Sequence, residues 1–209
     1  MWNSLGGADR SLHDDTRDGQ DVRVLVVEKR YDAARPEVWN AVTTPDRIAR
    51  WLTPVSGELV LGGRYQLEGN AGGTVLRCEE PELLEVTWEF GGGVTWVVVT
   101  LVEDDAGTRL RLEHAAPVDQ PTAHEFGPGA VGIGWEMGLG GLRLHLADPE
   151  APRPDPDYTD PGYAAFVRAT GTAWAAADVA AGTDPEEANA AAERCIAAYT
   201  ALPLEESEG

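Results

Sequence analysis

The sequence predicts an α+β domain in which a curved antiparallel sheet wraps around one long helix. A run of short strand-like segments, separated by glycine and aspartate turns, occupies residues 57–116. Two short helical segments precede this run, and one long apolar helical segment, residues 130–147, follows it. The connections between the strands are short. They predict antiparallel neighbours, because parallel strands need a crossover of a dozen or more residues.

The first strand is predicted over residues 22–31, VRVLVVEKRY, because β-branched and apolar residues dominate this segment. The following segment, AARPEVWNAVTTPDRIARWLTP, predicts two short helices separated by a tight break. Pro36 and Pro45 suit the first turns of these helices, and Thr44 is a candidate N-cap for the second one.

Six further strands are predicted, and an alternating pattern shows which face of them is buried. Their sequences are GELVL, GRYQLEG, GTVLRCEE, LLEVTWEF, VTWVVVTLVED and TRLRLEHAA. In LLEVTWEF the apolar and aromatic side chains share one face, while the two glutamates and Thr87 share the other. We therefore expect one apolar, aromatic face and one solvated face.

The stretch EFGPGAVGIGWEMGLGGLRLHL carries the spacing G-x-G-x-x-G at Gly127, Gly129 and Gly132. A dinucleotide-binding fingerprint needs a buried strand before this spacing and another strand after the helix. Here polar, proline-broken segments stand on both sides. The stretch is better interpreted as a helix whose glycines allow close approach to a neighbour or leave space for a ligand.

Composition and charge exclude several functions. The formal net charge of −20 argues against binding to nucleic acid or anionic lipid. The sequence contains no run of about 20 apolar residues, so we expect no membrane insertion, and its first residues do not have the pattern of a secretory signal. Cys78 and Cys195 match no metal or redox spacing, so we expect a reducing cytoplasm, no metal site and no cofactor.

Five segments, in this order, resemble a known family: PEVWNAVTTPDRIARWLTP, GGRYQLEG, TVLRCEEPELLEVTWEF, GTRLRLEHAA and GWEMGLGGLRLHL. The chain resembles the activator-of-heat-shock-protein-90-ATPase homologue-like (AHSA-type) family of the START-like (SRPBCC) superfamily. The resemblance implies a helix-grip fold with a cavity between the sheet and the long helix. The superfamily includes lipid-transfer domains, polyketide cyclases and ligand sensors.

The chain is expected to divide into five parts around this domain. These are a disordered leader (1–20), the START-like domain (21–148), a linker (149–160), a helical extension packed on the domain (161–202) and a disordered tail (203–209). The extension is expected to cover a second apolar patch on the long helix, formed by Ile133, Met137 and Leu144, unless a second subunit does so. Glu136 and Arg143 are expected to face solvent between the two apolar patches of that helix.

Aromatic residues on the predicted inward faces are the main candidates for ligand contacts. The predicted ligand-binding residues are Trp39, Trp51, Tyr65, Trp88, Phe90, Trp96, His114, Phe126, Trp135 and Leu139. Plain core packing is the alternative interpretation for each of them. His114 alternates with Leu110 and Leu112, so it is expected to point inward as a polar anchor for ligand more than as a catalyst.

Three hypotheses for function follow from this pattern. The first is non-catalytic binding of an apolar or aromatic small molecule, lipid-, polyketide- or sterol-like, in an internal cavity. The second is a cyclase- or dehydratase-type enzyme that uses the same cavity, and the third is a chaperone-linked protein-interaction module. The expected partners are a small molecule and, at most, a second copy of the chain.

Overall fold

The computed structural model describes residues 1–2, 5–105, 107–119 and 125–201. Eight antiparallel strands form one sheet in the spatial order β1-β2-β8-β7-β6-β5-β4-β3. The strands are β1 (Asp9–Arg17), β2 (Gln20–Tyr31), β3 (Val55–Gly57), β4 (Arg64–Leu67), β5 (Gly72–Glu79), β6 (Leu83–Phe90), β7 (Gly93–Asp104) and β8 (Gly107–Pro117). The helices are α1 (Arg35–Thr43), α2 (Pro45–Trp51), α4 (Gly129–Ala147), α5 (Pro161–Ala180) and α6 (Pro185–Thr200).

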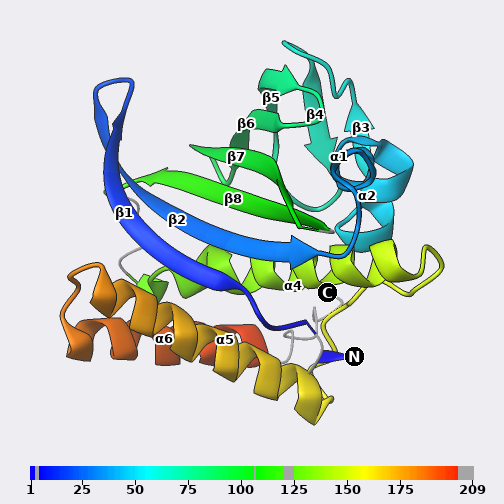
Figure 1. The fold of residues 1–209 in the computed structure, drawn as a ribbon. Helices are drawn as coiled ribbons and strands as arrows, with labels where there is room; N and C mark the ends of the chain where they lie inside the picture. Colours follow the sequence, from blue (N-terminus) through cyan, green and yellow to red (C-terminus); the bar gives the residue numbers. More distant parts are fainter. Residues whose placement is uncertain (3–4, 106, 120–124, 202–209) are drawn as a thin grey trace, which may run out of the picture.

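The elements form three layers, which Figure 1 shows from the side. The sheet curves over α4, and α5 and α6 lie against α4 on the side away from the sheet. Helices α1 and α2 close the sheet near the C-terminal end of α4. The predicted class, a curved antiparallel sheet around a long helix with a helical C-terminal part, is confirmed.

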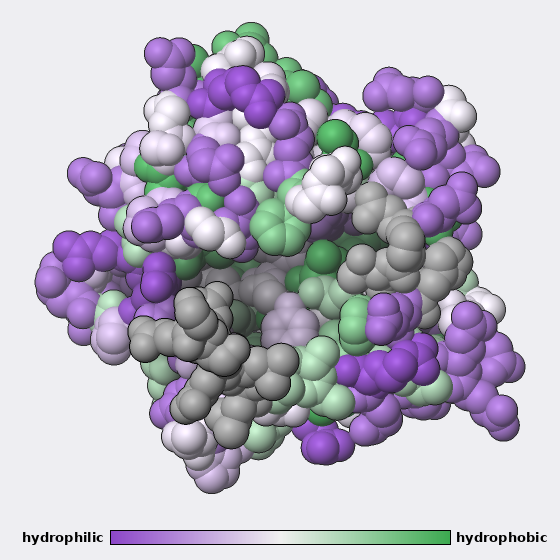
Figure 2. Space-filling model, turned by 180° about the vertical axis from the view of Figure 1, so that it is seen from behind, coloured by the Kyte–Doolittle hydropathy of each residue, from purple (hydrophilic) through white to green (hydrophobic). Residues whose placement is uncertain are grey.

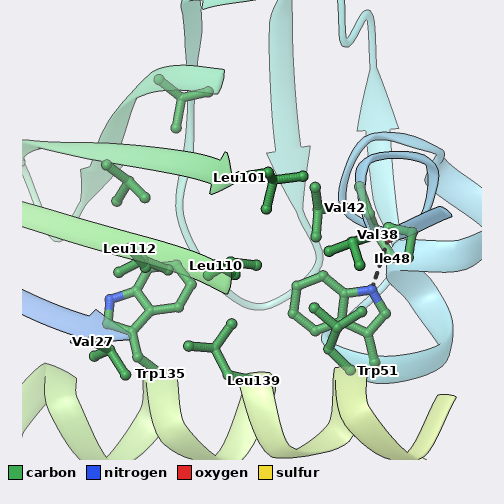
Figure 3. Packing of buried hydrophobic residues seen from close by; sticks show 14 of the residues in the cluster. Val27, Val38, Val42, Ile48, Trp51, Leu101, Leu110, Leu112, Trp135 and Leu139 are labelled. Atoms are coloured by element: carbon green, nitrogen blue, oxygen red, sulfur yellow. Dashed lines mark hydrogen bonds between the residues drawn. The ribbon is translucent and has the colours of Figure 1, made fainter. Parts of the chain in front are cut away.

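The main core fills the space between the sheet and the C-terminal half of α4. Figure 3 shows Leu139 of α4 pointing toward Leu110 of β8, and Trp51 of α2 packed against α1. The indole Nε1 of Trp51 donates a hydrogen bond to the carbonyl oxygen of Ala41 at 3.0 Å. Apolar side chains from the sheet, α1, α2 and α4 pack together in this region.

The predicted disordered leader is wrong, because the segment contains strand β1. Its residues pair with β2 along the whole strand, from Asp9 opposite Glu28 to Arg17 opposite Gln20. Asp18 and Gly19 make the turn with φ values of 52° and 79°, as a type I′ hairpin requires. The charged, alternating sequence therefore forms a polar edge strand, and Trp2 and Leu5 before it are buried.

Two other predicted boundaries differ from the structure or fall outside it. The segment GELVL was expected to be a strand, but β3 is short and earlier, Val55–Gly57, and Leu61 is exposed. Residues 149–160 connect α4 and α5 without a helix or strand. The predicted tail, 203–209, lies outside the described residues.

The glycines of α4 allow its neighbours to approach closely. A Cβ atom added at Gly132 would lie 2.4 Å from ring atoms of Trp174 in α5, and one at Gly140 would lie 2.8 Å from the Cβ of Leu5. Such distances are far below van der Waals contact, so a side chain at either position would displace its neighbour. Close approach therefore explains the glycine-rich sequence of this helix.

A second apolar cluster joins α4 to α5, α6 and the N-terminal residues, and we call it the helix-layer cluster. Its buried members are Trp2, Leu5, Ile133, Tyr163, Phe166, Val167, Cys195 and Ile196, with Phe126, Met137, Leu144 and Tyr199 packed beside them. The patch that was expected to need a cover thus faces α5 and α6 of the same chain.

The expectation that Glu136 faces solvent is wrong. Its side chain is fully buried, and both carboxylate oxygens accept hydrogen bonds from Arg10 at 2.6 and 2.5 Å. Strand β1 places Arg10 over this face of α4, which the sequence pattern of α4 alone does not reveal. Lys29 lies nearby and donates to the carbonyl oxygen of Leu5 at 2.5 Å. The pKa of Lys29 is lowered to about 8. Burial is the largest cause, and the positive charge of Arg143 is the second.

Candidate ligand-binding cleft

A large open cleft lies at the other end of the space between the sheet and the helices. Its volume is about 1400 Å³. The walls come from the β1–β2 hairpin, the ends of β6, β7 and β8, the start of α4, and the connection between α5 and α6. In Figure 1 these elements meet on the left of the molecule. Figure 2 shows the molecule from behind, with a hollow bordered by apolar residues in green.

The deep part of the cleft is lined by aromatic and apolar side chains from the inner face of the sheet. Trp88 of β6, Thr95 of β7, His114 of β8 and Leu25 of β2 all line it. Trp88 pairs with Thr95 across the two strands, and strand pairing places His114 opposite Val97. Because residues two apart on a strand share a face, these side chains meet in one patch.

A chain of hydrogen bonds fixes the orientation of His114. The indole Nε1 of Trp135 in α4 donates to His114 Nδ1 at 2.9 Å. The opposite ring nitrogen, Nε2, lies 2.8 Å from Thr95 Oγ1, and this hydroxyl donates to the carbonyl oxygen of Trp88 at 3.1 Å. The network assigns the proton of the neutral imidazole to Nε2, because Nδ1 accepts.

His114 is held in the neutral form. It is 4% exposed, and burial lowers the pKa of His114 to about 4. The rings of Trp88 and Trp135 pack on each other with their centroids 4.9 Å apart, beside this imidazole. Both ring nitrogens are engaged, so His114 offers a ligand an apolar ring edge and a rigid position more than a free base.

We expect His114 to make the fold sensitive to mild acid. An unfolded chain protonates histidine near pH 6.5, whereas the folded protein resists protonation down to about pH 4. In this window only the unfolded state takes up the proton, so stability falls as the pH drops from about 6.5 to about 4, by up to about 3 kcal/mol.

Urea unfolding at pH 7 and pH 4.5 measures this loss. His114→Gln should lose less stability between the two pH values than the unaltered protein does, because the glutamine does not titrate. His13→Gln changes an exposed histidine of β1 and serves as the control. Equal losses in the unaltered protein and in His114→Gln would contradict this prediction.

The mouth of the cleft combines exposed apolar side chains with carboxylates. Phe90, Val118 and Val131 line it and are 63%, 39% and 40% exposed. Arg23 also lines it and bridges two walls: its guanidinium donates to Asp14 of β1 at 2.8 Å and to Asp178 of α5 at 3.0 Å. This ion pair ties the hairpin to the C-terminal helices next to the cleft.

The structure brings together only part of the predicted site. Trp88, Phe90 and His114 line the cleft, and Trp135 lies directly behind His114. Trp39, Trp51, Tyr65 and Leu139 are in the packed main core. Phe126 packs beside the helix-layer cluster.

Trp96 was expected to line the same cavity but lies on the other face of the sheet. It packs with Val22, Val24 and Val26 of β2, under the guanidinium of Arg17, which lies 4.8 Å from the ring centroid. Arg17 also forms an ion pair with Glu85 of β6. Strand β7 is apolar on both faces, and the curled hairpin covers Trp96.

Several cleft residues were missed by the sequence analysis. Strand β1 with its turn, and the start of α6, which contributes Glu187, Ala188 and Ala191, lie in parts of the chain expected to be outside the domain. The Asp18-Gly19 dipeptide between two alternating segments was the available signal for the hairpin.

No group of three or more histidine, cysteine, aspartate or glutamate residues among the described residues is arranged to hold a metal ion. No helix within these ranges has the length and apolarity needed to cross a bilayer.

The sheet, the long helix and the open cleft define a helix-grip protein. The sequence pattern of the family described as Activator of Hsp90 ATPase homolog 1-like protein matches residues 32–147, more than half of the chain. The chain belongs to this family.

Solved structures agree with this assignment. The crystal structure of CalU16 from Micromonospora echinospora is 35% identical in sequence, covers 82% of this chain and 98% of its own, and has a TM-score of 0.68. The solution structure of CalU16 is 33% identical in sequence, covers 84% of this chain and 97% of its own, and has a TM-score of 0.70. Protein MLL2253 from Mesorhizobium loti is 25% identical, covers 62% of this chain and 99% of its own, and has a TM-score of 0.53.

DynU16, from the dynemicin biosynthetic locus, shares the fold. It is 24% identical and covers 63% of this chain and 50% of its own, with a TM-score of 0.55. A comparison with curated proteins found no match.

Proposed function

We propose that the protein binds an apolar, ring-bearing small molecule in the cleft and releases it unchanged. The observation that carries this proposal is the open cleft of about 1400 Å³ whose deep part is formed by Trp88, Leu25 and the neutral His114. A ligand that loses about 300 Å² of apolar surface there gains roughly 7 kcal/mol before the costs of association. Micromolar affinity is the expected result.

The chemistry of the lining favours binding over catalysis. Of the described lining residues, only His114 has an ordinary pKa near neutrality, and burial moves this pKa well away from it. Trp135 and Thr95 engage both nitrogens of its ring. General acid–base catalysis needs a group whose pKa lies near the working pH and whose lone pair or proton is free. His114 meets neither requirement.

We also propose a cytoplasmic location, because Cys78 and Cys195 are free thiols.

Filling the cleft should abolish ligand binding without harming the fold. Ala116 of β8 lines the cleft, so Ala116→Phe places a ring inside it. The fluorescence of N-phenyl-1-naphthylamine should rise on binding to the unaltered protein, with quenching of tryptophan emission, and both changes should be lost in the variant.

Val102→Phe adds the same ring at a position that is 54% exposed and does not line the cleft, so it should bind the probe normally. Native mass spectrometry of freshly purified protein would add the identity of any retained ligand. If Ala116→Phe binds the probe as tightly as the unaltered protein, the cleft is not the binding site.

A further inference from the structure

We propose that the cleft selects ligands that combine an apolar ring system with a protonated amine. This inference rests on the proposed function and adds the charge of the ligand. It follows from the contrast between the deep part of the cleft, which is neutral and aromatic, and the mouth, which is strongly acidic.

Acidic residues lie along the cleft on several separate elements. The six acidic lining residues are Asp14, Asp15, Asp21, Asp119, Asp178 and Glu187. They come from both strands of the hairpin, from the residues just after β8, from α5 and from the first turn of α6. Strand pairing places Asp15 opposite Val22, on the outer face of the hairpin, so the other five carry the argument. An amine in the mouth would therefore meet negative charge from the sheet side and from the helix side.

The only arginine among the described lining residues is already paired. Arg23 donates to both Asp14 and Asp178, so its single positive charge offsets one of their two negative charges. No described arginine or lysine forms an ion pair with three further lining carboxylates, Asp21, Asp119 and Glu187. The mouth thus keeps an excess of negative charge that a ligand can neutralise.

The aromatic lining suits the same ligand. Phe90 is 63% exposed at the mouth. Trp88 lies two residues before it on β6 and lines the deep part of the cleft. The face of an aromatic ring attracts an ammonium group, and most strongly where water is partly excluded. A cleft with low-dielectric walls and one sign of charge also focuses its field on the ligand. An anionic ligand would lose its hydration there and meet repulsion.

Three naphthalene probes with different charges test the inference on the full chain. They are 1-naphthylmethylamine, which is protonated at pH 7, its neutral N-acetyl derivative, and the anion 1-naphthaleneacetate. Isothermal titration calorimetry should give a dissociation constant for the amine roughly tenfold lower than for the neutral amide, with the anion weakest. Raising the salt concentration to 0.5 M should shrink this preference, because salt screens exposed charges.

A matched pair of triple variants separates the cleft from the overall charge of the protein. Asp21→Asn, Asp119→Asn and Glu187→Gln remove three carboxylates that line the cleft. Asp18→Asn, Glu58→Gln and Glu186→Gln remove three that do not line it, with the same change in net charge. The first triple variant should lose most of the preference for the amine, and the second should keep it.

Each other outcome overturns the inference in a recognisable way. Equal binding of the amine and the amide, or equal loss of preference in both triple variants, would refute the charge selection and leave the proposed function standing. Tighter binding of the anion would do the same. Binding of none of the three probes would refute both proposals together.

Discussion

A chain that ends at Glu150 is expected to lose most of its soluble yield and its cooperative thermal unfolding. The truncation removes α5 and α6 and exposes Ile133, Met137 and Leu144 on α4. It also removes Trp174, a fully buried member of the main core that sits against Gly132. The exposed face of α4 would then be an aggregation-prone apolar patch.

The size of the effect follows from the side chains that are lost. The buried large residues contributed by α5 and α6 are Tyr163, Phe166, Val167, Trp174 and Ile196. Each buried side chain of this size contributes about 2 kcal/mol, so their sum is about 10 kcal/mol, comparable with the whole stability of a domain. The extension is thus part of the fold and supplies one wall of the cleft.

The measurement is the soluble fraction after expression, followed by thermal unfolding monitored by circular dichroism. A chain that ends at Ala201 keeps both helices and is the control, with a melting temperature close to that of the full chain. If the chain that ends at Glu150 is as soluble and as heat-resistant as this control, then α5 and α6 do not stabilise the domain.

The sheet and its inner face were predictable where the alternation along a strand is strict. In β6 and β8 the pattern correctly placed Trp88 and His114 on the inner face, because neighbouring residues of a strand point to opposite faces. In β7 it failed for Trp96, because a strand that is apolar on both faces carries no signal of which face is inner. Only the pairing of β7 with β6 and β8 shows which face of β7 is the inner one.

The division between packed core and open cleft was not predictable from the sequence. The sequence places Trp39 and Trp51 on apolar helix faces. This pattern is the same whether the space beside those faces is packed with side chains or open to a ligand. Part of the cleft wall comes from the hairpin and from α6, and both lie outside the segments that carry the family resemblance. The charged sequence of β1 also resembles a disordered segment, because its polar side chains bury little surface.

The burial of Glu136 is another feature that the sequence concealed, and its consequence for stability is large. Replacing this residue with glutamine should lower the free energy of unfolding by about 3 to 5 kcal/mol, because it leaves Arg10 without its partner in a water-poor site. The same change at Glu89, whose ion pair with Arg64 is exposed, should cost less than about 1 kcal/mol. Urea unfolding of both variants at pH 7 gives the comparison.

The titration of Lys29 provides a readout that a simple packing defect would not change. Burial is the main cause that lowers the pKa of Lys29 to about 8, and Glu136 opposes this by its negative charge. In Glu136→Gln the pKa of Lys29 should therefore fall further. Lys29 is the only lysine of the chain, so its side-chain ¹³Cε resonance can be followed in a pH titration without further assignment. An unchanged pKa of Lys29, or a stability loss no larger than that of Glu89→Gln, would show that the negative charge of Glu136 does not offset the positive charges of Arg10 and Lys29.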